Sequence, residues 1–340
     1  MNSREGEITV ELRQLQTLVA IADHGSFSAA AKALVTVQSN VSAHLARLEK
    51  QLGAQLVERA TGNLTDEGEL VVARARRILH ELEDIDGDIH SLGQSPTGEC
   101  RLGSIGTTAR WLIPPMLLGL ERTHPGVRVT LLEGATSSLL PRVIAGEIDA
   151  AIVHLPVAGA GLQVTQMFSE ELLLIAPPGH PLAGRESVSL AELSEHPIIQ
   201  PPPGTPQRRI VDRTAASAGV AMRSLAEIDG VRLMASLVFD GFGAAIVPAS
   251  VVPAWLTGTF VRIAVPELPR RTVGWVQRER PRPNRATFAV RDMALDVISR
   301  HGPRQPGVTL SADGTAAGTA ATSGGRTAAR RPGNGGKPRV

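Results

Sequence analysis

The 340-residue sequence has one cysteine, no tyrosine and only 3% aromatic residues. With a single cysteine, Cys100, no intramolecular disulfide can form, which suits a reducing cytoplasm. The shortage of aromatic residues means that the core must be built from Leu, Val, Ile and Ala. We interpret Cys100 as a small residue that opens a buried strand, and a redox-sensing thiol is the alternative.

The sequence also shows neither a secretory signal nor a membrane span. The first residues, MNSREGEITVELRQL, are charged and contain no apolar stretch. The longest run without charge, Gly241–Val261, contains three glycines and two prolines. These residues oppose a membrane helix and favour buried strand and turn. We therefore expect a cytoplasmic protein that makes no membrane contact.

Net charge gives little hint of a nucleic-acid partner. The chain is +2 in total, but residues 301–340 carry six basic residues and one acidic residue, which leaves −3 for the rest. Residues 1–62 hold six basic and six acidic side chains. The segment after Arg300 is rich in Gly, Ala, Thr and Arg, so we predict a disordered basic tail over 303–340.

The segment Ser26–Leu52 predicts two short helices joined by a tight turn. Apolar residues of the second helix form one stripe at helical spacing: Val37, Val41, Leu45, Leu48 and Leu52. The opposite side is small and polar: Ser39, Asn40, Ser42, Ala43, Ala46, Arg47 and Lys50. A helix with such a face can enter a DNA major groove and form hydrogen bonds with base edges.

Three helices are expected in this region, with Gly25 and Gly53 ending the first and the third. Ser26 is predicted to cap the second helix, Phe27–Leu34, and Thr36 to cap the third. The first helix, Leu12–Asp23, is expected to turn five apolar side chains inward: Leu12, Leu15, Leu18, Val19 and Ala22.

A hairpin is predicted directly after the third helix. Gln55–Arg59 has the pattern of a short strand, residues 60–63 that of a turn, and Leu64–Thr65 that of a return strand. Such a hairpin would form a wing beside the helices and place Arg59 near a DNA phosphate. An ordinary surface hairpin is the alternative.

Thr65 is predicted to cap a long helix with Asp66 and Glu67 in its first turn. Its apolar residues follow a 4-3-4-3 spacing that favours pairing with a second copy: Val71, Ala75, Ile78, Leu82, Ile85, Ile89 and Leu92. The helix would span roughly 40 Å. Packing of this stripe against the same chain is the alternative to a dimer. Gly93–Gly98 has the composition of a hinge.

From Cys100 onward, strand patterns alternate with helix patterns, which predicts an α/β domain with a mostly parallel sheet. Predicted strands cover Cys100–Ser104, Val127–Glu133, Asp149–His154, Phe168–Ala176, Ile198–Gln200, Ala221–Ile228, Gly243–Val247, Val261–Ile263 and Thr272–Gln277. Predicted helices cover Leu112–His124, Ser137–Gly146, Gln207–Ala218, Val231–Phe239 and Ala286–Arg300.

Signals for catalysis are weak. The segment GSIGTT lacks the Gly-Lys-Ser/Thr ending of a phosphate loop, and the nine histidines do not have zinc-ligand spacing. We therefore expect no catalytic residue, no metal and no cofactor. A small-molecule-binding protein or an enzyme using the C-terminal α/β domain is the alternative function.

Several segments together resemble the LysR-type transcriptional regulators. The N-terminal match is LRQLQTLVAIADHGSFSAAAKALVTVQSNVSAHLARLEKQLGAQLVER, residues 12–59. Later matches are HPGVRVTLLEG (124–134), AGEIDAAI (145–152), PPGHPLA (177–183) and LVFDGFGAAIVP (237–248). The resemblance covers about residues 10–300.

The resemblance implies a multidomain α/β architecture like that of the family. Residues 1–65 would form a winged helix-turn-helix DNA-binding domain, 66–93 a dimerising linker helix and 94–99 a hinge. An effector-binding domain similar to periplasmic binding proteins would cover 100–302, with subdomain I at about 100–162 and 268–300 and subdomain II at about 163–267. The family implies a cytoplasmic homodimer or tetramer that binds double-stranded DNA and a small-molecule effector, with RNA polymerase as a further partner. The operator, the effector and the sign of regulation stay open.

On the recognition helix, the family motif implies DNA contacts by Gln38, Ser39, Ser42 and Arg47. With the neighbouring polar side chains and the wing, the predicted DNA-binding set is Thr36, Gln38, Ser39, Asn40, Ser42, Arg47 and Arg59. Two residues depart from the family pattern: Ala43 stands where a basic residue is common, and Asp240 replaces a small residue before Gly241.

The resemblance places the effector between two subdomains, at strand ends that meet helix N-termini. The predicted effector-binding set is Thr107, Thr108, Thr136, His154, Pro203, Gly204 and Thr205. For the threonines, helix capping is the alternative role, and it is compatible with ligand contact. A histidine in this set favours an anionic effector, a small carboxylate.

Overall fold

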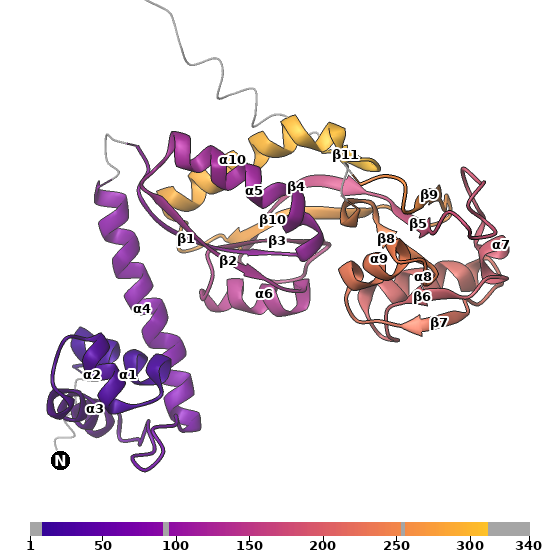
Figure 1. The fold of residues 1–340 in the computed structure, drawn as a ribbon. Helices are drawn as coiled ribbons and strands as arrows, with labels where there is room; N and C mark the ends of the chain where they lie inside the picture. Colours follow the sequence, from indigo (N-terminus) through magenta and orange to yellow (C-terminus); the bar gives the residue numbers. More distant parts are fainter. Residues whose placement is uncertain (1–8, 91–94, 253–255, 312–340) are drawn as a thin grey trace, which may run out of the picture. The chain divides into compact units, whose positions relative to one another are not determined.

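The computed structural model describes residues 9–90, 95–252 and 256–311 (Figure 1). The described residues divide into two compact units, one within residues 1–164 and 274–291 and the other within residues 165–273 and 292–340. The chain crosses from one unit to the other within β4, Leu162–Glu170, at β10, Arg271–Arg278, and within α10, Arg285–His301. Within the described ranges, no helix is long and apolar enough to cross a membrane.

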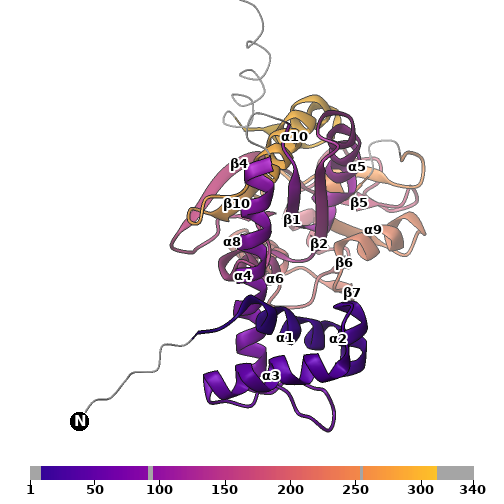
Figure 2. The same ribbon diagram turned by 90° about the vertical axis from the view of Figure 1, so that its left-hand side faces the viewer.

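Four helices form the N-terminal part of the first unit: α1 Leu12–His24, α2 Phe27–Ala33, α3 Gln38–Leu52 and α4 Asp66–His90. Figure 2 shows α1, α2 and α3 gathered about one end of α4. Their common core is aliphatic, with Leu18, Ile21, Leu45 and Leu48 fully buried. The predicted helix-turn-helix is therefore present, and its core is built without aromatic residues at its centre.

The predicted helix ends are largely confirmed. Ser26 caps α2 by accepting a hydrogen bond from the Ala29 N–H, and Gly25 and Gly53 end α1 and α3 in the left-handed conformation. The Thr65 hydroxyl accepts from the Gly68 N–H at 3.0 Å in the first turn of α4. The prediction that Leu12 faces inward is wrong, because this first residue of α1 is 43% exposed.

The apolar stripe of α4 changes environment along the helix. Ala75 is fully buried in the core that α1–α3 share with α4, so the start of the stripe packs against its own chain. Four later stripe residues are exposed between 43% and 61%: Ile78, Leu82, Ile85 and Ile89. Leu92 lies outside the described residues. Most of the stripe is thus left uncovered by a single chain.

Strands and helices alternate in the remainder of the first unit: β1 Gly98–Ser104, α5 Gly106–Thr123, β2 Val127–Glu133, α6 Thr136–Ala145 and β3 Ala150–Leu155. β1 is the central strand, pairing in parallel with β2 on one side and with β3 on the other. The parallel arrangement brings the carboxyl ends of β1 and β3 to one edge, where α5 and α6 begin.

The larger sheet has the order β11-β4-β10-β3-β1-β2. Two predictions about it are wrong. The single strand predicted over Phe168–Ala176 is two strands, β4 and β5 Leu172–Ala176, separated by Glu171. The tail predicted to be disordered from residue 303 starts with a short 3-10 helix, Gly302–Arg304, and with β11, Val308–Leu310, which pairs antiparallel with β4.

Arg270 explains why β11 is ordered although its sequence is weakly apolar. Its guanidinium donates to the Gly307 carbonyl at 2.9 Å, to the Thr309 hydroxyl at 2.8 Å and to the Glu171 carboxylate at 2.6 Å. One side chain distant in sequence therefore satisfies the carbonyl just before β11 and a hydroxyl within it.

The second unit contains a five-stranded sheet with the order β7-β6-β8-β5-β9. Its further elements are α7 Leu190–Ser194, β6 Ile198–Gln200, α8 Pro206–Ser217, β7 Ser224–Glu227, α9 Val231–Phe239, β8 Ala244–Pro248, a 3-10 helix Ala249–Val251 and β9 Val261–Ala264. β6 pairs in parallel with β7 and β8, whereas β5 runs antiparallel to β8 and β9, so the sheet is mixed.

Candidate nucleic-acid interface and ligand-binding residues

Helix α3 has one buried face and one open face. Val41, Leu45 and Leu48 are at most 1% exposed and pack into the helical core. The predicted base-contacting residues Gln38, Ser39, Asn40 and Arg47 are exposed, and Ser42 is half-buried. Among the described residues, the Arg47 guanidinium meets no carboxylate and makes one weak hydrogen bond, from Nε to the Ala43 carbonyl at 3.4 Å. The helix therefore presents donors and acceptors to solvent.

The start of α3 differs from the prediction. The N-cap residue is Val37, whose side chain cannot accept a hydrogen bond and is 59% exposed. Thr36 is therefore not the cap, and Val37 does not belong to the buried stripe. The Thr36 hydroxyl instead accepts from the Asn40 side-chain amide at 3.0 Å. Both side chains belong to the predicted DNA-binding set, and this bond fixes their relative position.

The turn before α3 contains Val35, the one non-glycine residue with positive φ in the described ranges, at φ 51°. It is 93% exposed, so its side chain gains no packing that would compensate for the backbone conformation. A β-branched residue in the left-handed region is disfavoured by roughly 1–2 kcal/mol.

The predicted wing is present as a minimal hairpin. Val57 and Leu64 form an isolated antiparallel bridge, and the Glu58 N–H donates to the Asn63 carbonyl at 2.8 Å. Gly62 lies at the turn with φ 78°, where a side chain would also meet the Gly25 carbonyl. The hairpin tip therefore lies close against the helix-turn-helix.

Glu49 of α3 anchors this wing, a role that the helix pattern did not reveal. Its Oε1 accepts the backbone N–H groups of Leu56 and Val57 at 2.9 and 3.3 Å, and its Oε2 pairs with Arg59 at 3.1 Å. Arg59 was predicted to contact a phosphate. Its side chain is 55% exposed, so it bridges the wing to α3 while remaining accessible to solvent.

The predicted ligand residues of the first unit lie at the ends of β1 and β3. Thr107 and Thr108 are in the first turn of α5, both buried, and Thr136 is the first residue of α6. The Thr136 hydroxyl accepts the backbone N–H of His154 at 3.1 Å, so it joins β3 to α6 and does not cap its helix. The Thr108 hydroxyl oxygen is buried and has no hydrogen-bond partner among the described residues.

The predicted ligand residues of the second unit form the turn before α8. Thr205 caps this helix, accepting from the Arg208 N–H at 3.4 Å, and it donates to the Pro202 carbonyl at 3.0 Å. Gly204 has φ 84°, a conformation that favours glycine, and Pro203 precedes it. The capping alternative is therefore satisfied at Thr205, and its hydroxyl is already engaged twice.

Cys100 is fully buried, as predicted, but it is the third residue of β1, which begins at Gly98, and so does not open the strand. Burial is the main cause that raises the pKa of its thiol far above the ordinary value, and the nearby charge of Asp149 raises it further. The reactive thiolate is therefore scarcely populated at neutral pH.

Comparison with known proteins agrees with this geometry. The family described as LysR substrate binding domain matches residues 93–299, and the family described as bacterial regulatory helix-turn-helix protein, lysR family, matches residues 12–69. The HTH-type transcriptional regulator TtuA of Agrobacterium vitis is 31% identical over 301 residues, which are 85% of this chain and 95% of TtuA. A probable hydrogen peroxide-inducible genes activator of Mycobacterium avium is 32% identical over 80% of this chain and 84% of its own length.

Solved structures show the same fold. A full-length OxyR variant from Pseudomonas aeruginosa has a TM-score of 0.65 and 25% identity, covering 84% of this chain and 98% of OxyR. Full-length CbnR in complex with its target DNA has a TM-score of 0.65 and 23% identity, covering 85% of this chain and 99% of CbnR. The relatives are transcriptional regulators and not enzymes. Since one family match covers more than half of the sequence and the other its helix-turn-helix, the chain belongs to the LysR family of DNA-binding transcriptional regulators.

Proposed function

We propose that this regulator binds promoter DNA as a homodimer, with two copies of α3 in successive major grooves and a small carboxylate as its effector. The observation that carries the proposal is the division of α3 into a buried apolar face and an open face of small and polar side chains. A two-fold dimer reads two half-sites whose centres are separated by about 34 Å or a multiple of it.

The residues of α3 suit direct readout of bases. Gln38 and Asn40 carry amides that can pair with adenine, Arg47 can donate two bonds to guanine, and Ser39 and Ser42 can contact several base edges. The wing residue Arg59 adds a positive charge suited to the phosphate backbone. Ala43, at a position where a basic residue is common in the family, adds no positive charge to this face of α3.

The exposed stripe of α4 supports a homodimer. Ile78, Leu82, Ile85 and Ile89 recur at 4-3-4 spacing, which matches the seam of a two-stranded coiled coil. His80 and Gly87, which contact the chain's own α/β part, lie at the heptad position opposite the seam. One face of α4 thus holds its own chain while the other is open to a second copy.

The DNA proposal is tested with a footprint and a gel shift on the DNA just upstream of the gene. We expect a discrete protected site with two-fold symmetry. Arg47→Ala should weaken binding by about 1–3 kcal/mol, and Arg74→Ala, an exposed arginine on α4, should leave it unchanged. Diffuse protection that responds equally to both substitutions would contradict sequence-specific recognition by α3.

The effector proposal rests on Thr108, Thr136 and His154 in the first unit. The buried Thr108 hydroxyl, the half-buried Thr136 hydroxyl and the N–H groups at a helix start, next to a histidine, suit a carboxylate better than a cation. In a thermal-shift screen of small mono- and dicarboxylates, a ligand at 100 times its Kd should stabilise the protein by about 2.7 kcal/mol.

Two threonine substitutions separate effector binding from folding. Thr136→Val should abolish the ligand-induced shift, whereas Thr123→Val, at the far end of α5, should preserve it. A screen in which only amines or neutral compounds stabilise the protein would reject the carboxylate assignment. Such a result would leave the DNA-binding proposal intact.

A further inference from the structure

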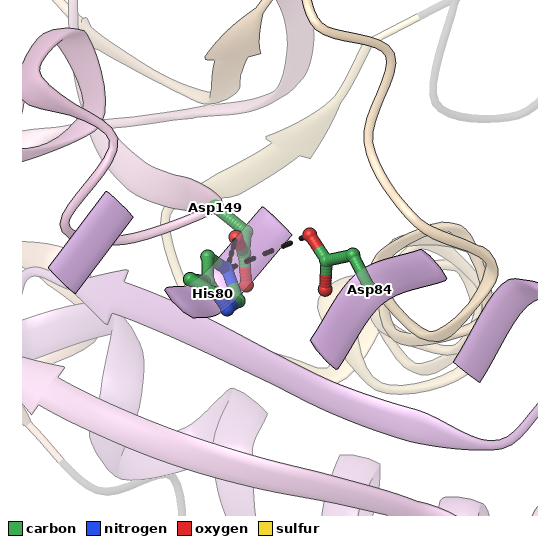
Figure 3. A group of neighbouring side chains, drawn as sticks. All are labelled: His80, Asp84 and Asp149. Atoms are coloured by element: carbon green, nitrogen blue, oxygen red, sulfur yellow. Dashed lines mark hydrogen bonds and ion pairs between the residues drawn. The ribbon is translucent and has the colours of Figure 1, made fainter. Parts of the chain in front are cut away.

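A histidine and two aspartates converge in the first unit at a place that neither DNA binding nor the predicted effector site uses. His80 and Asp84 project from α4, and Asp149 directly precedes β3 (Figure 3). His80 Nε2 lies 2.6 Å from Asp149 Oδ1 and 3.7 Å from Asp84 Oδ2. The side chains of His80 and Asp149 are only 2% and 5% exposed.

Each carboxylate is held by its other oxygen. Asp149 Oδ2 accepts the backbone N–H of Arg101 at 2.7 Å, and Asp84 Oδ1 accepts the side-chain amide of Asn284 at 2.5 Å. Asn284 is itself fixed, because its amide also donates to the Glu99 carbonyl at 2.9 Å. One oxygen of each aspartate is therefore left facing His80 Nε2.

These separations fit a metal ion with little rearrangement. Ligand atoms about 2.1 Å from a metal, at tetrahedral or octahedral angles, lie about 3.0–3.4 Å from one another. The observed 2.6 and 3.7 Å fall on either side of that range. On the other edge of the ring, His80 Nδ1 is buried and makes no hydrogen bond within the described residues, with the Glu83 carboxylate 3.9 Å away.

The local charge also favours a cation. Three carboxylates lie between 2.6 and 3.9 Å from the ring nitrogens, those of Glu83, Asp84 and Asp149. In the described part of the chain, Arg101 is the guanidinium that pairs with one of them, Glu83, and it also pairs with Glu99. The Arg101 guanidinium is directed to Glu83 and Glu99 and not to the two aspartates.

We propose that His80, Asp84 and Asp149 bind one divalent first-row transition-metal ion, of the class of Zn²⁺ or Mn²⁺, which fastens α4 to the start of β3. One nitrogen and two carboxylate oxygens suit these ions better than thiolate-seeking metals, and water would complete the coordination. Without the ion, the same three groups form a hydrogen-bonded network in which Nε2–H donates to Asp149. The test distinguishes these two roles.

The experiment is calorimetric titration of full-length protein, freed of metal with a chelator, using Zn²⁺, Mn²⁺ and Mg²⁺ separately. We expect one Zn²⁺ or Mn²⁺ per chain, a raised melting temperature with either ion and no saturable binding of Mg²⁺. Co²⁺ should give d–d absorption without a thiolate charge-transfer band, which excludes Cys100 as a ligand. Absence of saturable binding of any transition metal overturns the proposal.

Two variants locate the ion. His80→Gln keeps a donor toward Asp149 but removes the ligand nitrogen, and should weaken binding by more than about 100-fold. Asn284→Ala should weaken it by about 10–100-fold, as removal of an outer-shell partner does. His180→Gln, which alters a histidine beside His196 in the second unit, is the matched control and should change nothing.

The pattern across variants decides the outcome. Equal stoichiometry and affinity in wild type and His80→Gln would overturn the proposal and place the ion elsewhere. If His80→Gln does not fold, the Mn²⁺ electron paramagnetic resonance signal of Asn284→Ala takes its place, and an affinity equal to wild type would then overturn the site.

Discussion

Two neighbouring valines give the recognition region an unusual start. Val35 occupies a left-handed turn, and Val37 occupies a cap position where its side chain satisfies no N–H group of α3. Both side chains are exposed, so burial compensates neither the strained backbone of Val35 nor the missing cap at Val37. The residues at which α3 begins are thus suboptimal for stability.

Replacing Val35 with Asn should stabilise the folded protein. Asn tolerates positive φ, and the expected gain in the free energy of unfolding is about 1 kcal/mol. Urea unfolding measures it, with Val35→Ala as the control that removes β-branching but retains a Cβ. An unchanged or lower midpoint for Val35→Asn would show that the turn is not strained.

Replacing Val37 with Ser should add the missing cap. A serine hydroxyl there can accept the N–H of Asn40, for a gain of about 1 kcal/mol. Since the position borders the predicted DNA-binding face, unfolding should be measured without DNA. A cap that adds no stability would imply that another group already satisfies this helix end.

The single cysteine of this chain, Cys100, is buried, so we do not expect it to react as a thiol, although several relatives are named for hydrogen peroxide. We expect native protein to react with a thiol reagent much more slowly than urea-unfolded protein, because a fully buried thiol is reached only through local opening. DNA affinity should be equal before and after peroxide treatment, in wild type and in Cys100→Ala. A peroxide response that disappears in Cys100→Ala would reverse this conclusion.

At the scale of elements, α4 has two different faces: one contacts its own chain, and the opposite one is exposed. The face that carries His80 contacts the α/β part of the same unit, and the stripe of Ile78, Leu82, Ile85 and Ile89 is uncovered. Most of this division could be predicted from heptad spacing. The packing of Ala75 into the core of α1–α3 could not be predicted in this way. Spacing alone does not identify the partner of an apolar side chain.

Leu82→Lys should convert the dimer to monomer by placing a charge at the centre of the stripe. Ala73→Lys adds the same charge at an exposed position opposite the stripe and should leave the dimer intact. Sedimentation of both variants provides the comparison. If Leu82→Lys sediments as wild type does, α4 is not the dimer interface.

Sequence patterns predicted the helix-turn-helix, the caps at Ser26 and Thr65 and the parallel arrangement of β1 with its neighbours. They missed what depends on long-range partners. Glu49 anchors a wing seven residues away, Arg270 holds β11, and His80 meets Asp149 across 69 positions of sequence. None of these interactions leaves a periodic signal in the sequence, because each is made by one polar side chain whose partner comes close only in the folded structure.

At the scale of the whole molecule, charge is distributed unevenly along the chain. Residues 312–340 carry five basic residues and one acidic side chain, whereas the N-terminal 62 residues are balanced. The DNA-binding and effector-binding residues remain predictions. None of them belongs to residues 312–340, which carry the excess of positive charge. We therefore predict that non-specific attraction to DNA and sequence reading belong to different parts of the chain.

Removing residues 312–340 should reduce salt-dependent, non-specific DNA binding more than binding to the operator. For every phosphate that the shortened protein no longer neutralises, the slope of log K against log salt should become shallower by about 0.9. Gel shifts on operator and random DNA at several salt concentrations measure both effects. A truncated protein with an unchanged slope on random DNA would show that the tail does not bind phosphates.

The burial of the only cysteine makes this regulator directly suitable for site-specific labelling. A cysteine introduced at an exposed position of α3 or of the wing would be the sole thiol open to a dye, with no need to mutate the native one. Two such dyes in a homodimer would report the separation of the recognition helices by energy transfer. The distance between half-site readers can thus be followed in solution while DNA, effector or metal is added.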